Sequence, residues 1–100
     1  MSRVFLSNAA LEDLQRLEEF LVESKDPLVG EWVEFILDAL QVLTHQPGIG
    51  RPVGGGLREL IISRGHSGYL ARYEFDQAND LVRVARIRHQ RESGYSAEEL

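Results

Sequence analysis

The side chains best suited to chemistry gather near the end of the chain. Arg86, Arg88, His89, Arg91 and Tyr95 follow one another within ten residues. Guanidinium groups favour planar, bidentate contacts to carboxylate or phosphate. An imidazole with an ordinary pKa changes its charge near neutral pH and can act as a general base or acid. Which chemistry this cluster performs depends on where its side chains point.

Further arginines precede this cluster in the sequence. Arg51 lies in a glycine-rich stretch, and Arg58 and Arg72 each lie in a segment that reads as a strand. We expect the guanidinium groups of Arg58, Arg72 and Arg88, from three hairpin-linked strands, to converge on one patch. The candidate contacts for a target or partner are therefore Arg51, Arg58, Arg72, Arg86, Arg88, Arg91 and Tyr95.

The strand that carries most of this cluster is predicted from alternation between Leu81 and Ile87. Apolar residues fall on both of its faces, which predicts a central strand. Side chains alternate between faces along a strand. One face would hold Leu81, Arg83, Ala85, Ile87 and His89, and the other Val82, Val84, Arg86 and Arg88. Sharing a face with Ile87 favours a structural imidazole at His89 over a catalytic one.

Two more strands precede this one at hairpin spacing. Residues 57–63 and 68–76 alternate, and the turns between the three strands are rich in Gly, Asn, Asp and Ser. Tyr69, Tyr73 and Phe75 share one face of the middle strand, an aromatic stripe typical of a core. The segment 47–56 holds five glycines and two prolines. It lacks the Lys-Ser/Thr ending of a phosphate-binding loop, so we interpret it as a connector.

The first half of the chain predicts one strand and two helices. Residues 3–7 read as a strand, and Ser7 or Asn8 can cap the helix that follows. That helix buries Leu11, Leu14, Leu17, Phe20 and Leu21 and turns Glu12, Asp13, Gln15, Arg16 and Glu19 outward. Asp26 and Pro27 predict the start of a second helix that ends near His45, with Trp32 as a core anchor. The two should form an antiparallel hairpin over about residues 8–45.

The predicted order is β-α-α-β-β-β, an α+β fold in which a helix hairpin packs on a small, largely antiparallel sheet. The chain of 100 residues suits one domain. The predicted parts are the hairpin, a three-stranded part over about 57–89 and a tail over 90–100. We expect a cytoplasmic protein with no membrane span, since no apolar run is long enough and no signal peptide is evident. Neither a cofactor nor a metal ion is predicted, and without cysteine there is no disulfide.

The net charge of −5 is unevenly distributed. Residues 1–50 hold three cations against nine acids, whereas residues 51–92 hold eight arginines against five acids. An acidic half thus precedes an arginine-rich half. Composition alone favours solubility and surface ion pairs as the role of these charges.

The order of the predicted helices and strands, together with the sequence motifs, resembles the RelE/ParE toxin superfamily of type II toxin–antitoxin modules. The resemblance is greatest to its ParE, or plasmid-stabilisation, branch. The resemblance runs through SNAALEDLQRLEEFL, LTHQPGIGRPV, LRELIIS, GYLARYEF and RIRHQRESGY. It implies a small growth inhibitor that a cognate antitoxin neutralises by wrapping its carboxy-terminal segment around the toxin, in a hetero-oligomer. ParE-type members are understood to poison DNA gyrase by protein contact.

Two alternatives stay open beside the gyrase poison. RelE-type members are metal-independent endoribonucleases that cut mRNA on the ribosome, and the resemblance would then give His89, Arg58, Arg72, Arg88 and Tyr95 catalytic roles. That chemistry needs a base, a proton donor and cations for the phosphorane. The basic lysines of the first carboxy-terminal strand are absent here, because the single lysine is Lys25. In the other alternative the arginines only pair with the antitoxin.

Overall fold

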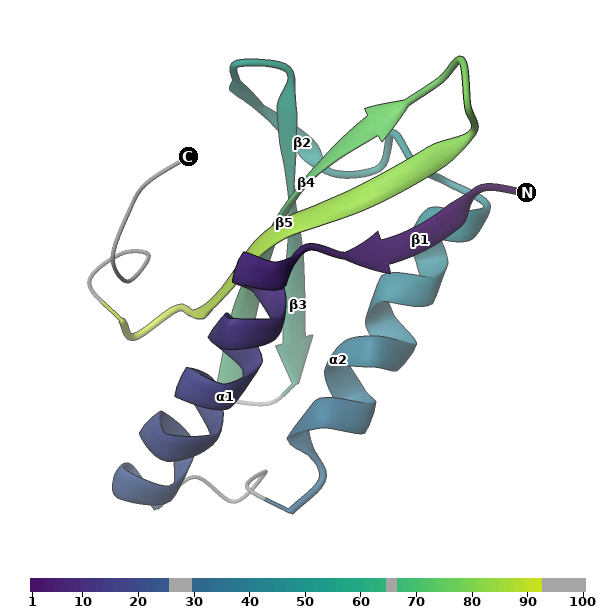
Figure 1. The fold of residues 1–100 in the computed structure, drawn as a ribbon. Helices are drawn as coiled ribbons and strands as arrows, with labels where there is room; N and C mark the ends of the chain where they lie inside the picture. Colours follow the sequence, from purple (N-terminus) through teal and green to yellow (C-terminus); the bar gives the residue numbers. More distant parts are fainter. Residues whose placement is uncertain (26–29, 65–66, 93–100) are drawn as a thin grey trace.

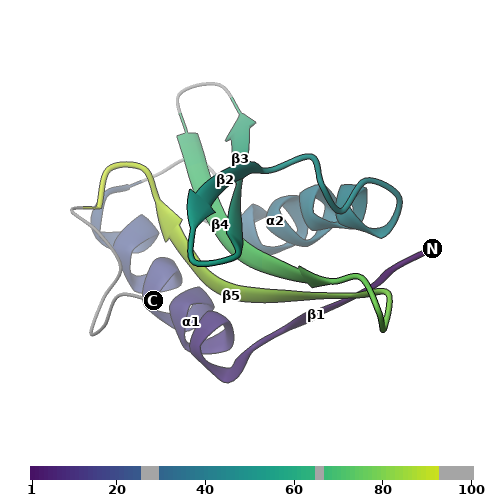
Figure 2. The same ribbon diagram turned by 90° about the horizontal axis from the view of Figure 1, so that it is seen from above.

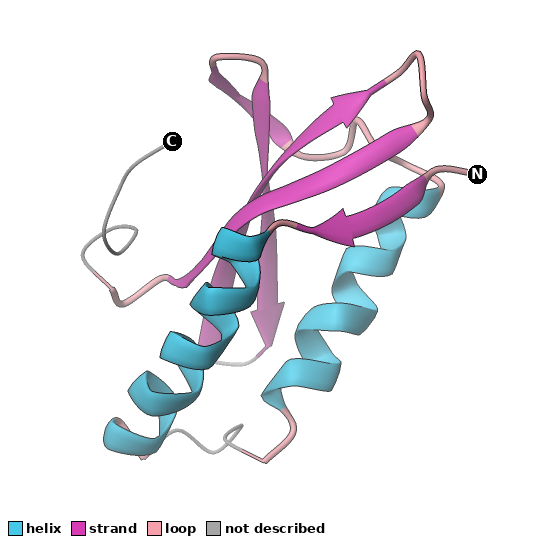
Figure 3. Cartoon of the chain, viewed as in Figure 1, coloured by secondary structure: helices cyan, strands magenta, loops and turns pink. Residues whose placement is uncertain are grey.

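The computed structural model describes residues 1–25, 30–64 and 67–92. Figure 3 shows helices and strands in the predicted α+β arrangement. In chain order they are β1 (Arg3–Leu6), α1 (Asn8–Glu23), α2 (Trp32–Leu40), the 3-10 turn η1 (Gln41–Thr44), β2 (Arg51–Gly54), β3 (Leu57–Arg64), β4 (Ser67–Asp76) and β5 (Leu81–His89). The fold class is confirmed, with one strand more than the sequence predicted.

The strands form a single twisted sheet in the order β1-β5-β4-β3-β2 (Figures 1 and 2). β1 pairs with β5 in parallel, and every other neighbouring pair is antiparallel. The first strand of the chain therefore lies beside the last. β5 is internal, between β1 and β4, as its apolar residues on both faces predicted.

The extra strand is β2, which lies inside the segment interpreted as a connector. Arg51 and Pro52 pair with Glu59 and Arg58 of β3, and Gly54 pairs with Leu57. Proline is tolerated there because β2 is an edge strand and needs to donate few ladder hydrogen bonds. Gly54, Gly55 and Gly56 all have positive φ, between 63° and 93°, and reverse the chain into β3. The glycines thus serve a tight hairpin and not a ligand loop.

A β-bulge in β5 changes which side chains face the core. Tyr73 pairs with Val84, but Arg72 pairs with Arg86, so Ala85 is the extra residue. The prediction that faces alternate without interruption along β5 is wrong beyond Val84. The core side of β5 holds Val82 and Val84 before the bulge and Ile87 after it. The bulge keeps apolar residues inside along the whole strand.

Both helices contribute to one core. Leu17 and Leu21 of α1 and Ile36 and Leu40 of α2 are buried in the same cluster as Tyr69, Tyr73, Val84 and Ile87 of the sheet. Trp32 is 6% exposed, which confirms it as a core residue. Figure 1 shows α1 and α2 running in opposite directions, as predicted for a helix hairpin.

The helix ends agree with the sequence in part. The Ser7 side chain accepts a hydrogen bond from the Ala10 N–H and so caps α1. The predicted start of the second helix at Asp26 and Pro27 lies outside the described residues, and α2 itself begins only at Trp32. It ends at Leu40 and continues as η1 to Thr44, close to the predicted end. None of the described helices is long and apolar enough to cross a membrane.

Candidate functional site

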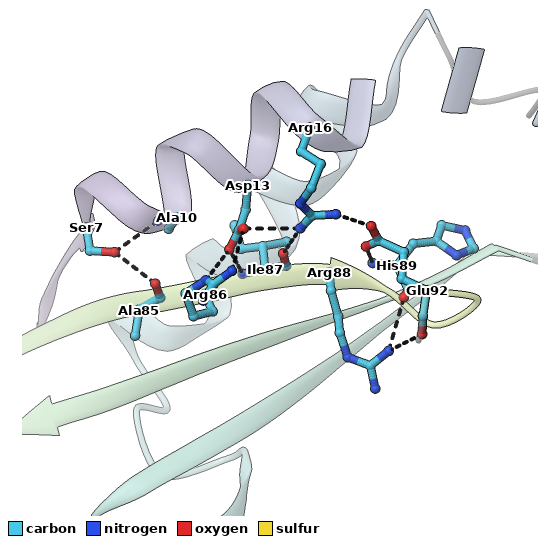
Figure 4. A network of polar contacts seen from close by, with 10 residues as sticks. All are labelled: Ser7, Ala10, Asp13, Arg16, Ala85, Arg86, Ile87, Arg88, His89 and Glu92. Carbon is cyan, nitrogen blue, oxygen red and sulfur yellow. Dashed lines mark hydrogen bonds and ion pairs between the residues drawn. The ribbon is translucent and has the colours of Figure 1, made fainter. Parts of the chain in front are cut away.

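α1 lies along the edge of β5 where β1 no longer covers it. β1 pairs with Leu81 to Val84 only. Beyond that point the Ser7 N–H donates to the Val84 carbonyl, and the Ser7 hydroxyl donates to the Ala85 carbonyl at 2.9 Å. Figure 4 shows side chains of α1 continuing this series along the strand. Polar side chains of a helix thus replace a neighbouring strand, which protects the edge from pairing with another chain.

Asp13 is the centre of this edge. Its carboxylate accepts hydrogen bonds from Arg86 Nε at 2.8 Å, from the second Arg86 nitrogen at 3.0 Å and from the Ile87 backbone N–H at 2.8 Å. Arg16 donates to the same carboxylate at 3.1 Å and to the Ile87 carbonyl at 3.1 Å. Asp13 is 2% exposed and Arg86 4%. A buried pair of this kind is stable only because its hydrogen bonds are satisfied.

Arg86 therefore lies inside the fold and offers little surface to a partner. Asp13, predicted on the solvent side of its helix, is buried, and that prediction is wrong. Its position in the sequence carried a signal: Ala10, Asp13, Leu17 and Leu21 form one helical stripe with spacings of three and four, and all four are buried. An acid within an apolar stripe indicates a buried cationic partner, although not which of the eleven Lys and Arg residues it is.

His89 is fully buried at the end of β5. Its ring lies 5.2 Å from the Phe20 ring and 5.0 Å from the Tyr69 ring, centroid to centroid. Nδ1 accepts the Arg91 backbone N–H at 3.0 Å, which places the proton of the neutral imidazole on Nε2. The exposed fraction of His89 is 0%. The predicted structural imidazole, bonded to backbone, is confirmed in its geometry. His89 shares the core-facing side of β5 with Ile87, as predicted, but the bulge takes Ala85 off that face.

A tight turn follows His89 and carries Arg91 and Glu92. The Glu92 N–H donates to the His89 carbonyl at 3.0 Å, and the Glu92 side chain accepts the His89 N–H at 2.9 Å. Arg88 donates to the Glu92 carbonyl at 2.8 Å, and Arg16 forms an ion pair with the Glu92 carboxylate. Arg91 is exposed, with its guanidinium 5.9 Å from the Phe20 ring centroid. Hydrogen bonds of this turn therefore bring Arg88, His89 and Arg91 close together.

The other predicted arginines divide between the two faces of the sheet. Arg51 and Arg72 both pair with Glu59, at 2.9 Å and 3.4 Å, in a row across β2, β3 and β4. Arg72 lies opposite Arg86 on β5, so this row continues toward Asp13. A Glu59 that is 4% exposed between two arginines was not predicted as part of the site.

Arg58 lies on the other face. In the register between β3 and β4, Arg58 pairs with Tyr73 and Glu59 pairs with Arg72. Side chains of adjacent residues in a strand point to opposite faces, so Arg58 lies on the face opposite Glu59 and Arg72. Its guanidinium donates to the Gly50 carbonyl at 2.7 Å and the Gly48 carbonyl at 3.1 Å, and so anchors the loop before β2. The expected convergence of Arg58, Arg72 and Arg88 is wrong for Arg58.

Tyr73 anchors the same loop from the core side. Its hydroxyl donates to the Pro47 carbonyl at 2.7 Å and accepts the Gly50 N–H at 2.9 Å. Burial raises the pKa of this phenol above its ordinary value, against the smaller lowering effects of the Gly50 N–H and the Arg58 charge. A Cβ on Gly50 would lie 2.7 Å from the Tyr73 hydroxyl, so only glycine fits there.

Tyr95, the remaining predicted site residue, lies outside the described residues. Over the ranges that the structure describes, no group of three or more His, Asp or Glu side chains is placed to hold a metal ion. Sequence reasoning left four residues out of the site. Asp13, Glu59 and Glu92 bind predicted arginines, and Arg16 pairs with Asp13 and Glu92.

Comparisons with known proteins agree with this fold and these motifs. A family model described as the ParE toxin of the type II toxin–antitoxin system parDE matches residues 4–94. Toxin RelE3 of Caulobacter vibrioides is 32% identical over 89 residues, which cover 89% of this chain and 95% of that toxin. Toxin RelE1 of the same organism is 39% identical over 87 residues, covering 86% and 90%.

Two solved structures share the fold. A chain of the chromosomal ParDE toxin–antitoxin system from P. aeruginosa superposes with a TM-score of 0.72 at 22% identity, over 89% of this chain and 96% of that one. A chain of the toxin–antitoxin complex RelBE2 from Mycobacterium tuberculosis gives a TM-score of 0.54 at 22% identity, over 89% and 98%. On the family match and the curated relatives, this chain belongs to the ParE toxins of type II toxin–antitoxin systems, within the RelE/ParE superfamily.

Proposed function

We propose that this toxin arrests growth by contacting DNA gyrase, as the resemblance to the ParE branch implies, and that it cleaves no RNA itself. The observation that carries the proposal is the position of His89. A general base must come within hydrogen-bond distance of the proton that it abstracts. His89 is 0% exposed, and its Nδ1 already accepts a backbone N–H.

No other side chain of the described cluster replaces it. Arginine keeps its proton at physiological pH and makes a poor base. Arg86 is committed to Asp13, and Arg58 to the carbonyls of the loop before β2. What the described end of β5 offers to a partner is a hydrogen-bonded turn with Arg88 and Arg91, which suits recognition of a protein surface better than phosphoryl transfer.

In this proposal a cognate antitoxin neutralises the toxin in a cytoplasmic hetero-oligomer. Its carboxy-terminal segment would wrap the toxin and cover the arginines predicted as contacts. The support is the family itself and the two structural neighbours, whose chains come from toxin–antitoxin assemblies.

The second candidate is a ribosome-dependent endoribonuclease. It is favoured by the two curated relatives, which carry the name RelE. Induction of the toxin in cells, followed in parallel by DNA-break assays and by primer extension on translated mRNA, separates the two. We expect DNA breaks and intact mRNA. Cleavage of mRNA within codons in the ribosomal A site, without DNA breaks, would establish the second candidate instead.

A further inference from the structure

Glu92 is held at four points. The Glu92 N–H donates to the His89 carbonyl, and the Glu92 carbonyl accepts from Arg88 at 2.8 Å. One carboxylate oxygen accepts the His89 N–H at 2.9 Å, and the other pairs with Arg16. The backbone and the side chain of one residue are thus both fixed.

Arg16 connects this turn to the rest of the molecule. Its guanidinium contacts Glu92, Asp13 and the Ile87 carbonyl. Asp13 in turn binds Arg86 and the Ile87 N–H inside the fold. Figure 4 shows this series running from α1 across the edge of β5 to the turn. The position of the turn is therefore set by α1 as well as by the strand that precedes it.

We propose that Glu92 is a positioning residue for toxicity. Together with Arg16 it forms a clasp that fixes the turn 89–92, and with it the positions of Arg88 and Arg91. The inference rests on the proposed function in one respect, that the turn 89–92 contacts the target. It goes further by assigning control of that contact to a residue of α1, 76 positions away in sequence.

The clasp orders the turn 89–92 more than it stabilises the whole fold. Arg16 and Glu92 are 24% and 13% exposed, so solvent weakens their attraction and the pair adds little to global stability. Holding the turn in one conformation removes an ordering cost that binding would otherwise meet. Loss of the clasp should therefore reduce potency more than it reduces the unfolding temperature.

The test compares Glu92→Gln, Arg16→Met and the double variant in the full chain. Glu92→Gln keeps an oxygen for the His89 N–H but removes the charge that Arg16 binds. We expect amide exchange at His89 and Arg91 to rise by roughly fivefold and the dose for half-maximal growth arrest to rise by a similar factor. The double variant should lose no more than the larger single loss, because the Arg16–Glu92 contact is already broken in Arg16→Met.

Two controls separate positioning from general stability. Glu19→Gln removes an exposed acid of the same helix and should leave potency unchanged. Ile62→Val removes one methyl from a core residue that is 4% exposed in β3, a strand that β4 separates from β5. It should lower the unfolding temperature at least as much as Glu92→Gln while potency at equal soluble protein stays at the wild-type value.

Two results would overturn the proposal: wild-type potency in Glu92→Gln despite faster amide exchange, or an equal loss of potency in Ile62→Val. Because growth arrest is measured whatever the target, a ribosomal target would refute the proposed gyrase contact and leave this test intact.

Discussion

Asp13 of α1 and Arg86 of β5 form a buried, two-bond ion pair between residues 73 positions apart, with distances of 2.8 and 3.0 Å. The same carboxylate accepts the Ile87 N–H. One side chain therefore neutralises a buried cation and completes the hydrogen bonding of a strand edge. The pair fixes α1 against β5 at the point where the strand delivers its arginines.

Asp13→Ala should be among the most destabilising single changes outside the apolar core. It leaves Arg86 buried without its counter-ion and Ile87 without an acceptor, a loss of about 3–5 kcal/mol. Urea unfolding of the purified toxin measures it, with Glu12→Ala, an exposed acid next along the helix, as the matched control expected to change stability by less than about 0.5 kcal/mol. Replacing Arg86 by Met in the Asp13→Ala background should recover part of the loss. If the double variant is no more stable than Asp13→Ala, the unpaired Arg86 is not the cause of the lost stability.

Tyr73→Phe should cost about 1–3 kcal/mol, because the Gly50 N–H loses its acceptor in a buried place. The raised pKa of Tyr73 also makes stability depend on pH. The folded state holds the phenol proton more tightly than the unfolded state, whose pKa is near 10.0. Stability from this group is complete below pH 10 and falls as the pH rises above it. Unfolding measured between pH 8 and 11 should show a shallower decline in Tyr73→Phe, and identical slopes in the two proteins would contradict the account.

Arg91→Ala should reduce potency by about tenfold, the effect of removing an arginine from an interface. Its side chain is exposed and its guanidinium lies 5.9 Å from the Phe20 ring centroid, so stability should change by less than about 1 kcal/mol. Arg83→Ala is the control, since Arg83 is 45% exposed and pairs with Glu74 away from the turn. Equal potency losses in both variants would indicate that net charge, not position, governs the effect.

His89→Gln separates the two candidate functions. The change should destabilise the fold by about 1–3 kcal/mol, because it removes a buried ring packed on Phe20 and Tyr69. The folded fraction should still poison its target when assays are run well below the unfolding temperature. Potency per folded molecule, with folding followed by circular dichroism, is the measurement. A loss of a hundredfold or more with folding intact is what an essential general base would give, and would contradict the proposal.

The spacing of apolar residues alone predicted the regular helices and strands. Both helices, the aromatic stripe of β4 and the central place of β5 follow from apolar spacing. β2 was missed because a four-residue edge strand containing Pro52 and Gly54 has the composition of a loop. A single extra residue, Ala85, reversed the faces of Arg86 and His89 relative to Val82 and Val84. An alternating sequence pattern does not reveal where a bulge lies.

The candidate site was predicted in composition but not in arrangement. The sequence identifies the arginines, yet it does not say which acid holds each one. Asp13 and Arg86, or Arg16 and Glu92, meet only after β1 and β5 have paired in parallel. Arg58 and Arg72 lie on opposite faces because of the register between β3 and β4, which the turn alone did not fix. Contacts between distant segments depend on this tertiary register.

The most direct test of the central claim is a cleavage assay with purified gyrase, relaxed plasmid, ATP and increasing amounts of this toxin. The account predicts that linear, protein-linked DNA accumulates with toxin dose, that His89→Gln retains the effect, and that the cognate antitoxin abolishes it. If DNA remains uncleaved and supercoiling proceeds at the normal rate, while the same preparation cuts mRNA on ribosomes, the claim is contradicted.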